Sequence, residues 1–294
     1  MSYDFTTSTH GKWVLVGEHA VLRGHAAIVY PLRDRRLTLS YTSGDQPINV
    51  VVSGEHSSNM QSLFLQLMMH ASKCLGQISR PITGTFILEN NIPLGVGMGA
   101  SAALSVAVAR WFAARDSWPV NQKILFAREL ENLFHGKSSG LDIAGVSARA
   151  GIVFQQGQST SIEQLWQPNF ALSSSGEVGL TAACIERVNT LWTKDQAQAL
   201  LLDAAMQACV LQVIDSLKNR TQNALINLSQ AMNRAADCFV AWGLVSDTLK
   251  DQMQLLRDAG ALAVKPTGSG LGGMIISLWQ DPVNPHIDNI LHLI

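Results

Sequence analysis

The sequence has 294 residues, of which 47% are hydrophobic and only 15% are charged. A chain of this length can bury a large core, and its balance is the opposite of that of disordered proteins. The formal net charge of -1, without basic blocks or an acidic tail, removes the electrostatic case for nucleic acid or an anionic membrane as a partner.

Four cysteines lie far apart in the sequence: Cys74, Cys184, Cys209 and Cys238. Disulfide frameworks and zinc sites use paired or closely spaced cysteines, so reduced thiols in a cytoplasmic protein are expected. The polar start of the chain indicates no signal peptide. The most apolar run, residues 102–114, contains Arg110 and is shorter than the roughly 20 residues that span a bilayer, so it is predicted to be a buried helix.

The first half of the chain contains both strand and helix patterns. Short apolar runs predict strands at residues 12–17, 26–30, 37–41, 48–52, 83–88 and 151–156. The turn signal at residues 43–45 predicts that two of these runs form a hairpin or meander. Helical spacing of apolar residues predicts helices at residues 59–75, 101–114, 119–134 and 142–150.

A boundary is predicted within residues 157–180, where Gln, Ser, Thr and Gly accumulate. Beyond it, the patterns predict helices at residues 194–217, 220–238 and 244–258, then strands at 261–264 and 274–279 around a glycine loop at 268–273. Strands first and helices later indicate an α+β protein in two lobes, which we expect at residues 1–160 and 161–294.

The first motif is PLGVGMGASAA at residues 93–103, with glycines on alternate positions before a helix. Inward-facing backbone N–H groups and the positive end of the helix would form a cradle for a polyphosphate. Ser101 stands where the helix is expected to begin, so its hydroxyl can cap the helix or reach a metal-bound phosphate. A glycine-rich turn with an N-cap is the structural alternative. No Gly-Lys-Ser/Thr follows, and the spacing does not fit a dinucleotide fingerprint.

The second motif is ENLFHGKSSGLD at residues 131–142. Glu131 is expected near the end of one helix and Asp142 at the start of the next, around a bend at Gly136 and Gly140. A metal ligand and a base are then available as a pair, whereas a lone Asp at this place would usually be an N-cap.

The third motif is KPTGSGLGG at residues 265–273, between two predicted strands. Its glycines would allow backbone to approach a phosphate, or they would serve only a tight hairpin.

Together these segments resemble the three signature motifs of the GHMP kinases, in the family's order and over about residues 10–280. GKWVLVGEHAV at residues 11–21 resembles the opening motif of the mevalonate kinases within this family. The resemblance implies an ATP-binding N-terminal lobe like domain 2 of ribosomal protein S5, and a ferredoxin-like C-terminal lobe. It also implies ATP- and Mg²⁺-dependent phosphorylation of mevalonate to 5-phosphomevalonate, in isoprenoid precursor synthesis.

The resemblance also implies a role for each matching residue. Asp142 would accept or orient the proton of the attacking hydroxyl, and Lys12 would pair with Asp142 and stabilise the transferring phosphate. Ser101 and Glu131 would hold Mg²⁺. The phosphates would be bound by Gly95, Gly97, Met98, Gly99, Ala100, Ser101 and Ala102. The acceptor site would contain Glu18, His19, Gly268 and Ser269, with a purely structural role as the alternative for Glu18.

Two positions depart from the family's pattern. Ala100 stands where a serine is frequent, and Leu271 interrupts the glycine run of the third motif. Either departure would narrow the phosphate site or shift the substrate preference. Neither changes Lys12, Ser101, Glu131 or Asp142, so activity is expected.

Other functions remain open at this stage. A phosphomevalonate kinase would need extra cations for its acceptor, for which Arg23, Lys137 and Arg149 are candidates. Another small-molecule GHMP kinase is a further alternative. A non-catalytic metabolite-binding protein would be marked by loss of Lys12 or Asp142, and both are present. The expected partners are small molecules, with no nucleic acid and no membrane, and a homodimer is allowed.

Overall fold

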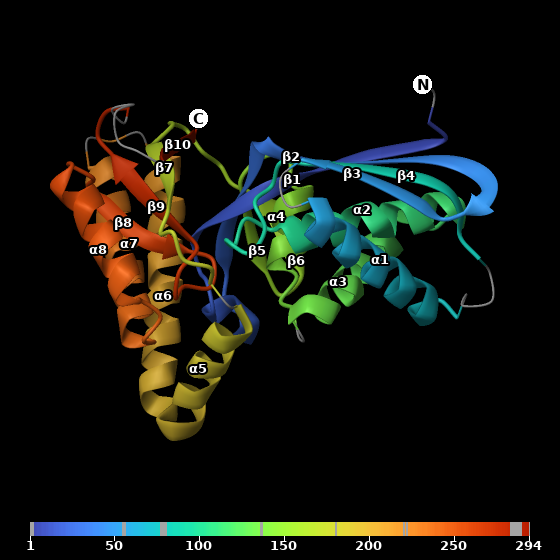
Figure 1. Ribbon diagram of the computed structural model, residues 1–294. Helices are drawn as coiled ribbons and strands as arrows, with labels where there is room; N and C mark the ends of the chain where they lie inside the picture. The colour runs from blue at the N-terminus through green and yellow to red at the C-terminus, as the bar shows by residue number, and fades with distance from the viewer. Residues whose placement is uncertain are drawn as a thin grey trace. The chain divides into compact units, whose positions relative to one another are not determined.

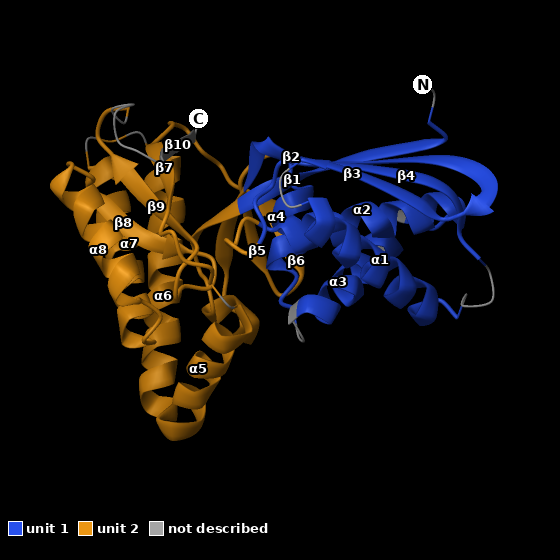
Figure 2. Ribbon diagram, viewed as in Figure 1, with its two compact units in different colours: residues 1–12, 31–94, 99–149 blue, residues 13–30, 95–98, 150–294 orange. Residues whose placement is uncertain are grey.

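The structure is a computed structural model that describes residues 3–54, 57–76, 81–135, 138–179, 181–219, 221, 223–282 and 290–293. The chain forms two compact units (Figure 2). Unit 1 comprises residues 1–12, 31–94 and 99–149, and unit 2 comprises residues 13–30, 95–98 and 150–294. Each unit is therefore built from segments that are separated in the sequence. The expected lobes at residues 1–160 and 161–294 stay a prediction.

Strands and helices are interspersed along the chain (Figure 1). The strands are β1 (Phe5–Val16), β2 (Ala27–Pro47), β3 (Asn49–Gly54), β4 (Thr83–Asn90), β5 (Ile152–Gln155), β6 (Gln158–Ser161), β7 (Asn169–Ser174), β8 (Ala263–Thr267), β9 (Met274–Trp279) and β10 (Ile290–Leu293). The helices are η1 (Ala20–Arg23), α1 (Ser57–Cys74), α2 (Ala100–Arg115), α3 (Val120–His135), α4 (Leu141–Ser147), α5 (Thr181–Lys194), α6 (Gln196–Lys218), α7 (Ala224–Ala241) and α8 (Asp247–Asp258).

In unit 1, β4 lies between β2 and β3. It pairs antiparallel with β2, where Leu37 faces Asn90, and parallel with β3, where Asn49 faces Thr85. The predicted hairpin or meander of residues 37–41 and 48–52 is therefore wrong, because β4 separates the two strands. Strand β2 continues through residues 43–45, where the register with β4 shifts, so the glycine of this turn signal belongs to an irregular strand instead.

Helix α2 is the buried centre of unit 1. Twelve of its sixteen residues are buried, as expected for its run of small and branched apolar side chains. Its Trp111 packs against Phe86 of β4, with ring centroids 5.0 Å apart, and Phe86 lies 5.2 Å from Phe64 of α1. This aromatic cluster holds α1 and α2 on one face of the sheet, and the predicted buried helix is confirmed.

In unit 2, an antiparallel sheet has the strand order β10-β7-β9-β8. The first strand of the sheet in sequence, β7, therefore lies in its interior, as in the expected ferredoxin-like order. Several elements of unit 2 were not predicted: β6 and β7 lie within residues 157–180, α5 begins directly after that segment, and β10 lies at residues 290–293. The apolar run of β7, Phe170–Ala171–Leu172, is buried but is too short to be recognised as a strand among its polar neighbours.

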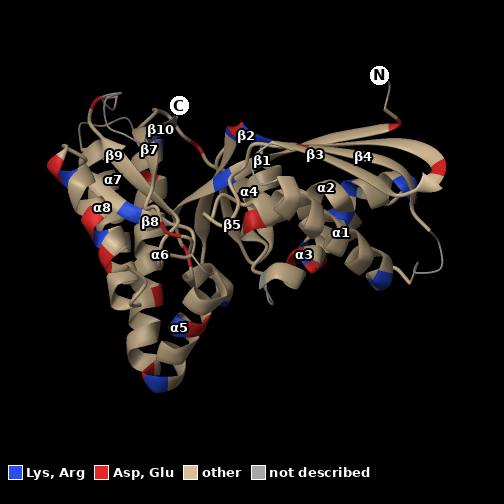
Figure 3. Ribbon diagram, viewed as in Figure 1, with Lys and Arg blue, Asp and Glu red and all other residues tan. Residues whose placement is uncertain are grey.

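The helices of unit 2 cover this sheet with amphipathic faces. On α8, Leu249, Met253 and Leu256 are buried in a cluster with Val264 and Ile275 of the sheet. Acidic and basic positions are interspersed along the rest of α8 (Figure 3). Of the described helices, α6 is long and apolar enough to cross a membrane, but a core helix meets the same criterion, and α6 packs against α7. It carries a buried carboxylate, Asp203.

Candidate active site

Unit 1 contains an ion pair between Lys12 and Asp142. Lys12 lies in β1 and its side chain is 3% exposed, whereas the Asp142 carboxylate, in the first turn of α4, is 33% exposed. The Lys12 Nζ atom lies 2.7 Å from Asp142 Oδ1. A buried ammonium thus holds a carboxylate that solvent or a small ligand can still reach, which is a suitable arrangement for moving a proton from a bound hydroxyl.

The N-terminus of α2 lies against this pair. Gly99 precedes α2 with φ of 81°, and a Cβ atom at this position would lie only 2.9 Å from Lys12 Cγ and 3.0 Å from Val146 Cγ1 of α4. The N-cap residues of α2 and α4 are Gly99 and Gly140, which have no side chain with which to cap their helices. The first-turn N–H groups of α2 therefore remain suited to binding phosphate oxygens beside Lys12.

The two capping alternatives are consequently wrong. Ser101 is the second residue of α2 and is half-buried, with Gly99 as the N-cap. Asp142 follows Leu141 within α4, so it occupies the first turn instead of the cap. Each residue lies two positions after the N-cap of its helix. Ala100 and Ala102, beside Ser101, are buried in the core of unit 1.

Glu131, on α3, is the second carboxylate of this region and is 1% exposed. The Ser138 hydroxyl donates a hydrogen bond to Glu131 Oε2 and accepts one from the Gly140 N–H at 3.0 Å. Burial, and then the negative charge of Asp142, raise the pKa of Glu131 to about 8. A cation would offset both effects, and a carboxylate with a hydroxyl offers the hard oxygen ligands that Mg²⁺ prefers.

The bend between α3 and α4 is partly visible. Asn132 Oδ1 accepts a hydrogen bond from the Ser138 N–H at 2.8 Å, and the Arg128 guanidinium donates to the Ser138 carbonyl at 3.0 Å. These bonds hold the segment that supports Glu131. Gly136 and Lys137, named in the second motif, lie outside the described residues.

In unit 2, the glycines of the first and third motifs meet. Gly95 and Gly97 have φ of 76° and 81°, and the Cβ position of Gly97 lies 3.7 Å from the Thr267 carbonyl oxygen. The Cβ position of Gly268 in turn lies 3.8 Å from the Gly97 carbonyl oxygen. Thr267 Oγ1 accepts from the Val14 N–H at 2.9 Å and donates to the Val14 carbonyl at 2.8 Å. The glycine backbone of the first motif thus packs against the backbone of the third motif, and hydrogen bonds between Thr267 and Val14 join the third motif to β1.

Leu271 adopts the backbone conformation that a glycine would have in the third loop. Its φ is 52°, a left-handed value that glycine adopts more easily, and its N–H donates to the Leu244 carbonyl at 2.8 Å. A Cβ atom on the neighbouring Gly270 would lie 2.7 Å from the same carbonyl oxygen. The loop therefore accepts a leucine at this position while it excludes any side chain at the one before.

His19 has a strained backbone and a buried ring. Its φ is 59° and its side chain is 5% exposed. Nε2 lies 2.8 Å from the Ser269 carbonyl oxygen, which can only accept, so this nitrogen carries the proton. Burial lowers the pKa of His19 to about 4, so the ring is neutral near pH 7. Its Nδ1 is buried and receives no hydrogen bond from any described residue, so it is available as an acceptor for a ligand.

Glu18 is joined to Lys265, the first residue of the third motif, in a pairing that the sequence did not predict. Lys265 Nζ lies 2.5 Å from Glu18 Oε1 and 2.6 Å from the Pro266 carbonyl oxygen, and the two side chains are 0% and 3% exposed. Burial raises the pKa of Glu18 and lowers that of Lys265, while their mutual attraction opposes both shifts. This geometry gives Glu18 a structural contact. The lysine before Pro266 was the available signal, but its partner is 247 residues away.

Arg23 forms a second buried pair. Its guanidinium donates two hydrogen bonds to the carboxylate of Asp203, one of them at 2.6 Å, and Asp203 is 1% exposed. The positive charge of Arg23 is therefore compensated within unit 2. Arg149 is exposed. Arg23 and Arg149 are the described cations that the sequence offered for a phosphorylated acceptor. One of them is already paired and the other is exposed.

The chain matches two domain models of one protein family. The model for the GHMP kinases N terminal domain matches residues 63–151, and the model for GHMP kinases C terminal matches residues 214–288. Together these matches cover more than half of the chain. A curated mevalonate kinase from Aeropyrum pernix is 28% identical, over 93% of this chain and 88% of its own length.

Solved structures share the fold. The L. major mevalonate kinase in complex with R-mevalonate has a TM-score of 0.76 at 22% identity, over 94% of this chain and 87% of its own. The Streptococcus pneumoniae phosphomevalonate kinase in complex with phosphomevalonate and AMPPNP has a TM-score of 0.72 at 15% identity, over 94% of this chain and 92% of its own. Since the two scores are so close, the fold by itself does not select the acceptor.

Proposed function

Because this chain belongs to the GHMP kinase family, we propose that it transfers the γ-phosphoryl group of ATP to the hydroxyl of mevalonate, giving 5-phosphomevalonate and ADP. The observation that carries this proposal is the Lys12–Asp142 pair at 2.7 Å, beside the uncapped N-terminus of α2. Mevalonate is favoured as the acceptor because 93% of the chain aligns with a curated mevalonate kinase at 28% identity.

The residues of unit 1 divide the reaction between them. Asp142 accepts the hydroxyl proton as the new bond from oxygen to the γ-phosphorus forms and the bond to the leaving ADP oxygen breaks. Lys12 stabilises the negative charge that is shared by the nucleophile and the transferring group. The N–H groups at the start of α2 bind phosphate oxygens. Phosphoryl transfer depends mainly on such positioning and charge stabilisation.

Glu131 and Ser101 would hold Mg²⁺, as their oxygen donors permit. The bound metal would supply neutralisation of the β- and γ-phosphate charge. Glu131 is pre-positioned by Ser138, and a cation would oppose the burial and the Asp142 charge that raise the pKa of Glu131. The loop that contains Gly95, Gly97 and Met98 would also bind phosphate.

His19 would take part in acceptor binding. A positive φ in a non-glycine residue is a form of local strain that is frequent at functional sites. The neutral ring offers its unpartnered Nδ1 to a hydroxyl or a protonated group. Ser269 and Gly268 would fix the ring, whereas Glu18 would act through its pair with Lys265. A cytoplasmic location and a homodimer belong to the same proposal.

Phosphomevalonate is the second candidate acceptor, on the strength of the similar fold of the pneumococcal enzyme. The compensation of Arg23 by Asp203 argues against it, because a second phosphate would need an unpaired cation nearby. A non-catalytic binding protein would not require the Lys12–Asp142 pair.

The test is ADP release in a coupled assay with Mg·ATP and mevalonate, phosphomevalonate, homoserine or galactose. Asp142→Asn should lower turnover by roughly 10²–10⁴-fold while ATP still binds, because the proton acceptor is lost. The matched control is Asp34→Asn, an exposed aspartate of unit 1, which should turn over like the wild type.

Turnover on mevalonate that disappears in Asp142→Asn supports the proposal. Turnover on a different acceptor moves the substrate and keeps the kinase. Full activity of Asp142→Asn would overturn the role of Asp142, and bound ATP without turnover on any acceptor would favour the non-catalytic alternative.

A further inference from the structure

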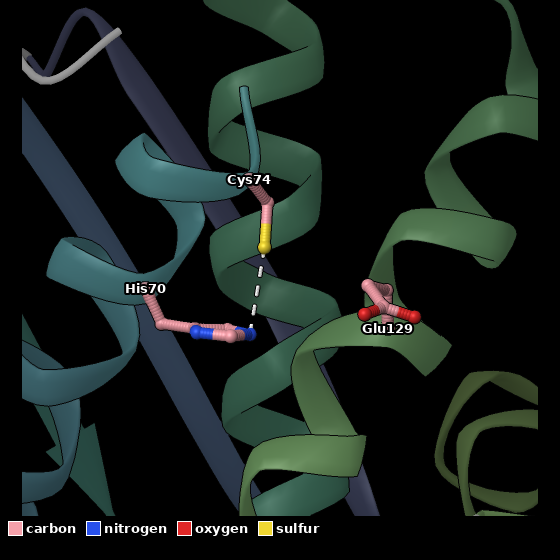
Figure 4. Close-up of side chains that lie close together, drawn as sticks. All are labelled: His70, Cys74 and Glu129. Atoms are coloured by element: carbon pink, nitrogen blue, oxygen red, sulfur yellow. Dashed lines mark hydrogen bonds between the residues drawn. The ribbon is translucent and has the colours of Figure 1, made fainter. Parts of the chain in front are cut away.

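Three side chains with metal-binding atoms converge between α1 and α3 of unit 1. His70 and Cys74 lie four residues apart on α1, hence on one face of that helix, and Glu129 lies on α3. One ligand atom of each side chain lies within 4.8 Å of the other two. Figure 4 shows His70 and Cys74 extending from the same helix, with Glu129 on the neighbouring helix facing them.

We propose that His70, Cys74 and Glu129 bind a zinc-class transition-metal ion, with solvent as the fourth ligand. Zinc takes nitrogen, sulfur and oxygen ligands in tetrahedral geometry, and three protein ligands with one open position is a common arrangement. The site is separate from the proposed kinase reaction and does not depend on it.

The distance between the first two ligand atoms fits this geometry. Zinc bonds of about 2.3 Å to sulfur and about 2.05 Å to nitrogen, at a tetrahedral angle, place the two atoms about 3.6 Å apart. Cys74 Sγ lies 3.5 Å from His70 Nε2. The pair is joined by a hydrogen bond in this structure, so the metal would replace the proton that the two atoms share.

The third ligand, Glu129, has a hydrogen-bond partner on its own helix. Asn132, one turn further along α3, donates a hydrogen bond from Nδ2 to Glu129 Oε2 at 3.3 Å. This bond orients the carboxylate and leaves its other oxygen for the metal, as outer partners of metal ligands commonly do. Cys74 and Glu129 are exposed and His70 is half-buried, so an ion can enter from solvent.

The donor set distinguishes this site from the carboxylate proposed for Mg²⁺. Thiolate and imidazole favour zinc and related ions, whereas Mg²⁺ favours oxygen alone. Glu129 and Glu131 are two residues apart on α3, so they point in directions about 200° apart around the helix axis. Glu129 is exposed and Glu131 is 1% exposed. One helix thus presents two different metal-binding faces.

Cobalt titration of the chelator-treated full chain tests the proposal, because Co²⁺ reports its ligands by absorption. We expect a near-ultraviolet thiolate-to-cobalt band that saturates at one equivalent and disappears on addition of Zn²⁺. Cys74→Ser should abolish the band, and His70→Gln and Glu129→Gln should each weaken binding by about tenfold or more.

Two control variants give the comparison. His25→Gln removes another half-buried histidine, and Glu131→Gln removes the buried carboxylate on the opposite face of α3. Both should give the same thiolate-to-cobalt band as the wild type. Circular dichroism of each variant checks that it is folded.

A thiol reagent gives an independent readout, because Cys74 is exposed while Cys184, Cys209 and Cys238 are buried. Zn²⁺ should slow the fast-reacting thiol of the native protein, and Mg²⁺ should not. The absence of a thiolate-to-cobalt band, a band that survives Cys74→Ser unchanged, or a thiol that Zn²⁺ does not protect would each overturn the proposal.

Discussion

At the residue scale, unit 2 contains an ion pair that is almost completely withdrawn from water. Lys265 and Glu18 lie in different motifs, and their charged atoms are 2.5 Å apart. Removing one partner of such a pair leaves the other charge buried without compensation, which costs far more than the pair itself contributes. The pair therefore specifies how the third motif meets the segment after β1.

Lys265→Met should destabilise the protein by about 3–5 kcal/mol, because Glu18 loses its counter-charge in a buried place. The double variant Glu18→Gln, Lys265→Met should recover part of this loss. Denaturant unfolding measures both effects, with Lys250→Met on the exposed face of α8 as the matched control. Equal losses for Lys265→Met and Lys250→Met would contradict the role given to the pair.

Glu131 should make the metal-free protein less stable as the pH rises. The folded protein holds the proton up to about pH 8, whereas the unfolded chain releases it near the ordinary value of 4.5. Unfolding between these values releases a proton, so the free energy of unfolding falls as the pH increases through this window. The stabilisation is complete below about 4.5 and is lost above about 8.

The measurement is the denaturation midpoint of the wild type and of Glu131→Gln across this pH range. The difference between the two proteins should shrink as the pH rises, because glutamine does not titrate. Addition of Mg·ADP should flatten the wild-type curve if Glu131 is a metal ligand. A difference that is independent of pH would exclude a raised pKa for Glu131.

At the element scale, the start of α2 depends on a glycine for two separate reasons. Gly99 has φ of 81°, and a Cβ atom there would also meet Lys12 Cγ at 2.9 Å. The turn between β5 and β6 contains a natural comparison, because Gly157 has φ of 82° with nothing within 4 Å of its Cβ position.

Gly157→Ala should therefore cost about 1–2 kcal/mol of stability and leave turnover unchanged, since only the left-handed conformation is penalised. Gly99→Ala should cost more and should also lower turnover, because the added methyl group displaces Lys12. Thermal unfolding and the ADP-release assay distinguish the two contributions. Equal behaviour of the two variants would mean that Lys12 moves aside without consequence.

At the scale of the whole molecule, the two compact units do not follow a single cut in the sequence. Residues 13–30 belong to unit 2, far from residues 150–294 along the chain. Trp13 stacks on Tyr30 with ring centroids 4.7 Å apart and packs edge-on against Phe170 at 5.3 Å. The first strands thus complete the core of unit 2.

The fragment 161–294, expressed alone, should consequently fail to unfold cooperatively, because it lacks Trp13 and the Val14 partner of Thr267. Co-expression with the fragment 1–160 should restore a cooperative transition. Near-ultraviolet circular dichroism against temperature follows both samples. A cooperative transition of the isolated fragment would show that these contacts are dispensable.

Much of this protein was accessible from the sequence because the information is local. Glycine spacing predicted the loops at residues 93–99 and 268–273, since positive φ values recur there. Apolar periodicity predicted α2, α3 and α6–α8 to within a few residues. The family resemblance pointed to Lys12 and Asp142, whose pairing the structure confirms. Their chemical roles remain a prediction.

Only the tertiary structure decided the contacts between distant residues. The parallel pairing of β3 with β4 overrode a local turn signal, because strand order depends on the whole sheet. The ion pairs of Lys265 with Glu18 and of Arg23 with Asp203 join segments that are about 180 to 250 residues apart in the sequence. The cluster of His70, Cys74 and Glu129 was equally hidden, since cysteine spacing reveals a metal site only when the ligands are close in sequence.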